Sequence, residues 1–236
     1  MKQLLATLFA SLIISACDQS IEPRENGLSG YWSFNDEFTV DNSGNGNDAI
    51  SHGAEADDGI IGRAANLKGS GYLEIPDDGA FGSYDRSFSV WIYKATSSIT
   101  AGYEAIAWKG PETGADVAFG LALENTSPPF RLTLSAGDGA DGVVSASTGD
   151  IIEAGEWHHV LAVVSPIEVT LFVDGRQESH VENTGGFARN SAPLLLGRVT
   201  ENASAARYFN GRIDEVRYYD RSLGLADAKA LFAAGK

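Results

Sequence analysis

Short apolar runs separated by clusters of glycine, aspartate, asparagine and serine recur along the chain from about residue 27 onward. Runs rich in Val, Ile, Phe, Tyr and Trp and bounded by such turn residues are typical of antiparallel β-strands. We therefore predict strands at residues 31–34, 48–52, 64–67, 72–75, 87–93, 105–109, 118–124, 131–136, 157–165, 168–173, 193–198 and 211–219. So many short strands, with no helical pattern between them, favour two packed antiparallel sheets over a parallel sheet with crossover helices.

The segment Trp157–Ser165 shows how this pattern predicts burial. Alternate positions of a strand point to opposite faces of the sheet, and here both sets are largely apolar. We therefore expect this strand to be covered on both sides. It should pair with Glu168–Val173, which ends at Asp174-Gly175, a favoured turn pair.

Only the C-terminal segment has a helical pattern. In Leu225–Ala234 the side chains of Leu225, Ala228, Leu231 and Phe232 share one helical face, and Gly235 follows as a C-terminal cap. We expect one short helix here.

The first seventeen residues differ from the rest. They contain one lysine, an apolar run and then small residues before Cys17, the single cysteine of the chain. This pattern predicts a secretory signal that is too short to span a bilayer. Ile14–Cys17 resembles the lipobox of bacterial lipoproteins, which implies lipidation of Cys17; an ordinary signal peptide cleaved nearby is the alternative. Residues 18–26 are polar and without periodicity, and are predicted to form a tether to a domain at 27–236.

The net charge of the chain limits the classes of partner that it can bind. The chain has 236 residues, with 17 basic and 32 acidic side chains and a formal net charge of -15. Such a protein repels phosphate backbones, so a nucleic-acid partner is not expected. Because the chain has a single cysteine, no internal disulfide can form. The lipobox resemblance implies that the protein is lipid-anchored in the cell envelope, on the periplasmic side or at the cell surface.

Several segments together resemble one known family. They are GYWSF at 30–34, DNSGNGN at 41–47, GRAANL at 62–67, GYLEI at 71–75, SFSVWI at 87–92, WHHV at 157–160, LFVDG at 171–175, LLG at 195–197 and GRIDEVRY at 211–218. In this order they resemble the laminin-G-like, concanavalin A-like jelly roll. The resemblance implies an all-β sandwich of two antiparallel sheets, here with a short C-terminal helix, that binds a sugar or a protein.

The loop Asp41–Asp48 is the most suggestive stretch for a metal. Its Asp and Asn side chains, hinged by glycines, are ligands that Ca²⁺ accepts. The resemblance implies a structural calcium held by this loop and by the aspartate of the IDEV segment, with Asp41, Asn47 and Asp214 as candidate ligands. We also expect Asp214 to share a strand face with Val216 and Tyr218, where a carboxylate needs a partner. The alternative is that Asp214 accepts backbone N–H groups and that the loop is an Asn/Gly turn.

Candidate catalytic groups are few. His158 and His159 are neighbours on a strand and point to opposite faces, so they cannot bind one ion together, and each is expected to make a structural hydrogen bond. Some glucanases with this jelly roll place two carboxylates on one strand as Glu-x-Asp-x-x-Glu, and no such run occurs here. We therefore favour a non-catalytic module.

Aromatic rings and planar polar groups are needed to bind a sugar. Trp32, Trp91 and Trp157 lie inside apolar runs and are predicted to be core residues. Trp108, with Tyr103 and Arg131, is the predicted ligand-binding patch, although Trp108 shares a strand face with Ile106 and can equally be core.

The sequence thus predicts a membrane-tethered, extracytoplasmic binding module for carbohydrate or an extracellular protein. The alternatives are a glycan hydrolase or lyase on the same jelly roll, and a purely structural adhesion domain. A hydrolase would require two carboxylates about 5 to 10 Å apart in a cleft.

Overall fold

The computed structural model of the protein describes residues 26–99, 102–140, 142–182, 186–200 and 207–236. These residues form fifteen strands and one helix. In chain order they are β1 (Leu28–Trp32), β2 (Ile50–His52), β3 (Glu55–Asp58), β4 (Arg63–Asn66), β5 (Tyr72–Ile75), β6 (Arg86–Lys94), β7 (Tyr103–Lys109), β8 (Phe119–Glu124), β9 (Phe130–Gly137), β10 (Val143–Ile152), β11 (Trp157–Ser165), β12 (Glu168–Val173), β13 (Arg176–Glu182), β14 (Leu194–Leu196), β15 (Gly211–Tyr219) and α1 (Leu225–Ala234).

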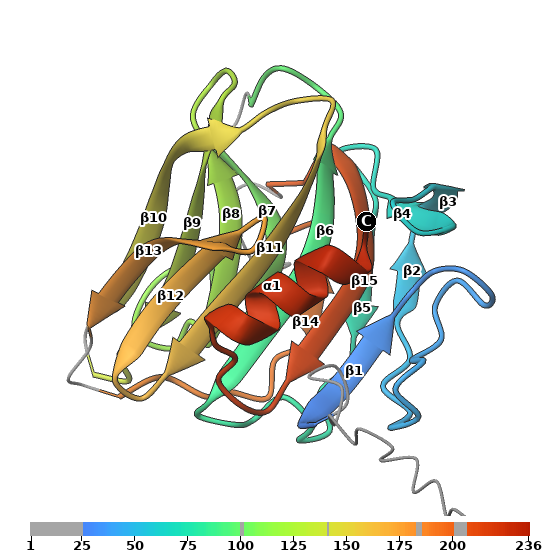
Figure 1. Ribbon diagram of the computed structural model, residues 1–236. Coiled ribbons are helices and arrows are strands. Elements are labelled where there is room, and N and C mark those ends of the chain that lie inside the picture. The colour runs from blue at the N-terminus through green and yellow to red at the C-terminus, as the bar shows by residue number, and fades with distance from the viewer. Residues whose placement is uncertain (1–25, 100–101, 141, 183–185, 201–206) are drawn as a thin grey trace, which may run out of the picture.

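The strands form two antiparallel sheets that face each other (Figure 1). One sheet has the order β13-β12-β11-β6-β15-β4-β3, with β1 also paired to β15; we call it the helix-side sheet. The other has the order β10-β9-β8-β7-β14-β5-β2, and we call it the open sheet. The predicted fold class, a two-sheet sandwich with a short C-terminal helix, is confirmed.

The main core fills the space between the sheets. Val160, Ala162 and Val164 of β11, and Leu121 and Leu123 of β8, belong to one buried cluster. This is the period-2 pattern expected of strands that present one side to the interior.

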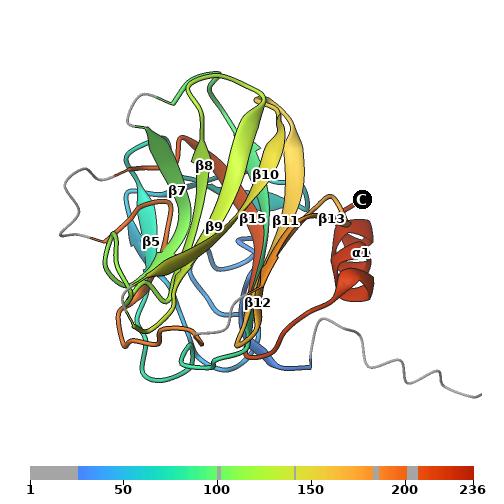
Figure 2. The same ribbon diagram turned by 90° about the vertical axis from the view of Figure 1, so that its left-hand side faces the viewer.

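Helix α1 covers the outer face of the helix-side sheet (Figure 2). Its Ala228 and Leu231 pack on Leu161, Val163 and Phe172 in a second cluster. The prediction that β11 is covered on both faces is therefore confirmed, and the helix is the reason. Within the part of the chain that is described, no helix is long and apolar enough to cross a membrane.

The structure contains three strands that the apolar pattern did not predict: β3, β10 and β13. Each forms the edge of a sheet. An edge strand meets a neighbour on only one side and is often polar, so the apolar signal is weak there.

The face predicted for Asp214 is wrong. The register of β15 against β6 shifts between Asp214 and Arg217, and Glu215 has a φ of 51°. This bulge inserts one residue, so Ile213 instead of Asp214 joins Val216 and Tyr218 in the core.

Candidate functional site

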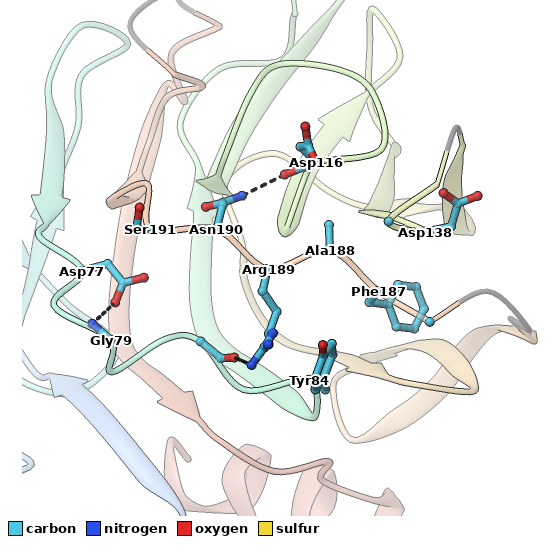
Figure 3. A pocket seen from close by; sticks show the side chains of 13 residues that line it. Asp77, Gly79, Tyr84, Asp116, Asp138, Phe187, Ala188, Arg189, Asn190 and Ser191 are labelled. Atoms are coloured by element: carbon cyan, nitrogen blue, oxygen red, sulfur yellow. Dashed lines mark hydrogen bonds between the residues drawn. The ribbon is translucent and has the colours of Figure 1, made fainter.

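A groove of about 670 Å³ lies at one end of the sandwich, where four connections meet (Figure 3). They are the connections from β5 to β6, β7 to β8, β9 to β10 and β13 to β14. The lining residues are Asp77, Gly79, Gly82, Tyr84, Asp116, Asp138, Gly139, Gly186, Phe187, Ala188, Arg189, Asn190 and Ser191. Binding residues are often carried by loops that a rigid sheet scaffold holds in place.

Tyr84 provides an aromatic surface in this groove. It is 49% exposed and is the one aromatic residue among the large exposed apolar side chains in the described chain. The guanidinium carbon of Arg189 lies 3.9 Å from the centre of its ring, and Arg189 Nη1 donates to the carbonyl oxygen of Gly82. This stack fixes the Tyr84 ring, because both planar groups limit each other's movement.

Hydrogen-bonding groups surround Tyr84. Asn190 Nδ2 donates to the carbonyl oxygen of Asp116 at 2.8 Å, which joins the β13–β14 and β7–β8 connections. Asp138 Oδ1 accepts the backbone N–H groups of Ala140 and Gly142 and so shapes its own loop. The groove therefore combines one exposed aromatic ring with amide and carboxylate groups, since its second aromatic residue, Phe187, is buried.

Asp77 belongs to the β5–β6 connection and lines the groove there. Its Oδ2 lies 2.5 Å from the buried Nζ of Lys109, which also donates to the carbonyl oxygen of Ala192. Burial tends to raise the pKa of Asp77, but the hydrogen bonds from Lys109 and from the backbone N–H of Gly79 outweigh burial and hold this pKa below its usual value. Asp77 thus stays ionised and is poorly suited to act as a general acid.

The buried side chain of Arg86 links three of the connections that frame the groove. Its side chain is 1% exposed and donates to the carbonyl oxygens of Ser83, Ala118 and Ala188, which belong to three different connections. Burial lowers its pKa, because the charged form loses hydration. The guanidinium fork suits this task, since it carries five donors in a fixed plane.

The predicted patch around Trp108 is only partly brought together. Trp108 and Tyr103 stack with ring centres 6.1 Å apart, but Trp108 is only 6% exposed and its Nε1 donates to the carbonyl oxygen of Pro111. The Tyr103 hydroxyl donates to Glu112, and burial raises its pKa to about 12. This pair lies on the outer face of the open sheet in a small apolar cluster with Val117 and Val199.

Arg131 lies on the same face, two strands from Tyr103. Tyr103 is opposite Glu124, and Glu124 is opposite Arg131. The Nε of Arg131 pairs with Oδ1 of Asp150 at 3.4 Å, and both side chains are well exposed. Tyr103 and Arg131 are therefore about 10 Å apart, and Trp108 lies farther along the sheet, in line with Gly120 and Ser135.

Asp41 organises its own loop. Its Oδ1 accepts the N–H groups of Tyr31 and Ser43, and its Oδ2 accepts that of Asn47. Asn47 in turn donates from Nδ2 to the carbonyl oxygen of Ser29. These bonds tie the loop to β1.

Asp214 holds a different turn. Its Oδ2 accepts the N–H groups of Ile60 and Ile61, and its Oδ1 accepts that of Glu215. Burial raises its pKa to about 7, against the lowering effect of these backbone hydrogen bonds.

Calcium takes six to eight oxygen ligands, and a carboxylate has about four acceptor positions. Asp41 and Asp214 each use three of these positions on backbone N–H groups. Throughout the described ranges, no group of three or more His, Cys, Asp or Glu side chains is placed to hold a metal. These two side chains alone do not fit a calcium cage, and the calcium site stays a prediction.

Two further predictions concern side chains elsewhere. His158 Nδ1 pairs with Asp174 and His159 Nε2 with Ser89, so the expected structural hydrogen bonds are confirmed. Cys17 and its lipobox lie outside the described residues.

The comparisons with known proteins agree with this architecture. Residues 67–229 match the model of the concanavalin A-like lectin/glucanases superfamily. The chain belongs to this superfamily. No curated protein matches it in sequence.

Solved structures of concanavalin A-like type are similar in fold. Domain 4 of AbnA, an extracellular GH43 arabinanase from Geobacillus stearothermophilus solved with arabinotriose, has 22% identity and a TM-score of 0.68, over 86% of this chain and 97% of that one. The binding domain of Paraclostridial Mosquitocidal Protein 1 has 17% identity and a TM-score of 0.72, over 90% and 53%. A structure of botulinum neurotoxin type C, a toxin whose cell entry depends on interaction with two ganglioside molecules, has 15% identity and a TM-score of 0.70. The match covers 92% of this chain and 53% of that one. This concanavalin A-like chain thus spans about half the length of the toxin structures, and its neighbours include carbohydrate-binding domains.

Sequence reasoning missed the groove residues of this concanavalin A-like domain. Tyr84 and Arg189 lie in connections outside any apolar run. One signal was present, because Tyr84 is an aromatic residue between glycine, serine and aspartate, with no strand to carry it into the core.

Proposed function

We propose that the protein is a carbohydrate-binding module and that the groove around Tyr84 is its binding site. The observation that carries the proposal is an exposed, fixed aromatic ring in a groove lined by amide and carboxylate groups. A sugar ring needs this combination, since its apolar face packs on an aromatic surface and its hydroxyls take hydrogen bonds. Sugar-binding neighbours with the same fold support the proposal.

The test is a glycan array with the chain carrying Cys17→Ser, followed by titration of any glycan that binds. Tyr84→Ala should weaken binding about tenfold or more, a loss of about 1.4 kcal/mol, whereas Tyr84→Phe should retain it. Ile167→Ala, which removes another exposed apolar side chain far along the sequence, is the matched control. Equal glycan affinity of Tyr84→Ala and the unaltered chain would exclude the groove as the binding site. If the protein retained protein partners but bound no glycan, the ligand would be a protein instead.

We also propose that the module is anchored in the cell envelope through a lipid on Cys17. The lipobox-like segment at Ile14–Cys17 supports this. In cells of a host that processes lipoproteins, Cys17→Ser should move the protein from the membrane fraction to the soluble fraction. Retention of Cys17→Ser in the membrane fraction would argue against the anchor.

A further inference from the structure

One row of side chains crosses the helix-side sheet far from the groove. Trp157 of β11 lies opposite Tyr93 of β6, and Tyr93 lies opposite Arg212 of β15. Arg212 is opposite Asn66 of β4, and Asn66 is opposite Glu55 of β3. Residues directly opposite one another in antiparallel strands point to the same face, so these five side chains form one row, which we call the aromatic row.

The aromatic row lies on the outer face. The residues before Tyr93 and after Arg212, Ile92 and Ile213, belong to the core between the sheets. Side chains alternate along a strand, so Tyr93 and Arg212 point away from this core.

Helix α1 ends just before the aromatic row. Its Phe232 ring stacks on Trp91 with centres 5.6 Å apart, and Gly235 also lies against the Trp91 ring. Trp91 is the preceding residue of β6 on the same face as Tyr93. The C-terminus accordingly lies beside β15 in Figure 1, and the helix leaves Tyr93 and Trp157 partly exposed. Trp157 was predicted as a core residue, and the structure gives it this boundary position instead.

The planar groups of the row are held in place. The rings of Tyr93 and Trp157 are 5.5 Å apart, and the guanidinium carbon of Arg212 lies 4.1 Å from the centre of Tyr93 and 5.4 Å from that of Trp157. Arg212 Nη1 also donates to the carbonyl oxygen of Asp58 at 2.7 Å. A fixed platform loses little side-chain entropy when a ligand binds.

The composition of the row indicates the kind of ligand. Two aromatic rings, a guanidinium, an amide and a carboxylate follow one another across five strands, a span of about 19 Å at the usual strand spacing. Two cations and two acids lie in or beside the row. Lys68 pairs with exposed Glu55 at its end, and Asp57 accepts a hydrogen bond from Asn66 and lies near Arg212. The four charges balance, so the row suits an uncharged chain of several sugar rings better than an acidic one.

We propose that the aromatic row is a second carbohydrate site, which binds one extended, uncharged polysaccharide chain. It is separate from the groove. Tyr84 lies just before Arg86, the first residue of β6, and Tyr93 lies about 24 Å along the strand from Arg86. The module then holds two glycan segments, one at each end of the sandwich.

The test uses tryptophan fluorescence. All four tryptophans lie within the described chain; Trp32, Trp91 and Trp108 are buried, so acrylamide should quench mainly Trp157. Soluble linear arabinan, xyloglucan and mixed-linkage β-glucan are the probes. Binding of one of them in the row should lower the quenching of Trp157 toward that of the buried tryptophans. Trp157→Phe, which keeps a ring and should fold, should remove the quenchable signal and weaken retention of the protein in gels that contain the polysaccharide.

The variant Tyr84→Ala separates the two sites. Protection of Trp157 should persist in Tyr84→Ala if the row binds by itself. A polysaccharide that binds without changing the quenching of Trp157, or whose protection disappears in Tyr84→Ala, would overturn the second site and leave the groove proposal intact. Failure of all three probes, together with protection of Trp157 by a co-purified protein, would make the row a protein interface and overturn the proposal.

Discussion

The buried guanidinium of Arg86 donates a hydrogen bond to the carbonyl oxygen of Ala188, 3.1 Å away and 102 residues along the chain. The same nitrogen donates to the carbonyl oxygen of Ala118 at 2.5 Å, and the other terminal nitrogen to that of Ser83 at 2.9 Å. Three connections that frame the groove thus depend on one side chain.

Replacement of this side chain should be costly. Arg86→Met keeps most of the volume but leaves three carbonyl groups without their donor, and we expect a loss of about 2 to 4 kcal/mol in the free energy of unfolding. Arg86→Lys should lose less, since it keeps the charge but lacks the planar fork. Urea unfolding measures both. Arg131→Met, which removes an exposed ion pair with Asp150, is the control and should change stability by less than about 1 kcal/mol. Similar losses for the two methionine variants would contradict this role of Arg86.

Stability should fall in acid because of His159. Burial lowers the pKa of His159 to about 3, far below its value near 6.5 in an unfolded chain. Below pH 6.5 the unfolded state therefore binds a proton at His159, whereas the folded state does not, so the free energy of unfolding falls progressively as the pH drops toward 3. Between pH 7 and pH 4.5 we expect His159 to lower the free energy of unfolding by about 2 to 3 kcal/mol.

The measurement is urea unfolding at several pH values with and without His159→Gln. The variant should be less stable at pH 7 but should lose less stability on acidification. His180→Gln, which changes a half-exposed histidine, should keep the pH dependence of the unaltered protein. Parallel pH profiles for His159→Gln and the unaltered protein would refute the prediction.

Gly120 allows Trp108 to lie flat on the open sheet. A Cβ at Gly120 would be 2.7 Å from the Cη2 and Cζ3 atoms of the Trp108 ring. Gly120→Ala should therefore displace the ring and reduce stability by about 1 to 3 kcal/mol. Thermal unfolding together with the tryptophan emission spectrum measures both effects. Gly149→Ala is the matched control, because a Cβ there meets only a side-chain carbon of Ile151 at 3.8 Å, and it should be close to neutral.

The sequence resemblance implies a structural calcium at the loop of Asp41, and melting curves test this implication. If Asp41, Asn47 and Asp214 contribute ligands, added calcium should raise the melting temperature of chelator-treated protein, by an amount that grows with its concentration. Asp41→Asn should remove this increase. An unchanged melting curve with calcium, or an equal increase in Asp41→Asn, would mean that the backbone hydrogen bonds of these carboxylates are their whole role.

The sequence predicted the fold well where burial is strong. Trp157–Ser165 and Glu168–Val173 have the predicted bounds, as does the helix Leu225–Ala234, because each must bury apolar side chains at a fixed period. Arg176–Glu182 was missed because it is a polar edge strand.

The candidate site could be predicted only in part. The face of Asp214 depends on a bulge at Glu215, a left-handed position that no glycine marks in the sequence. Arg86 reads as an ordinary charged residue at the start of a strand, and its burial depends on carbonyl groups from connections far away in the chain. Such long-range contacts leave no local pattern, and the groove that they form could therefore not be foreseen.

The described chain enters the domain beside the end of β15: Asn26 accepts a hydrogen bond from Arg221, and Leu28 pairs with Tyr219. Tyr219 in turn lies opposite Ser87, close to Tyr84 in sequence. Any attachment upstream of Asn26 would therefore hold the module by its groove end. With a short attachment, the groove would face glycans that lie along the supporting surface. Trp157 and Tyr93 would then face away from that surface, toward polysaccharide chains in the surroundings.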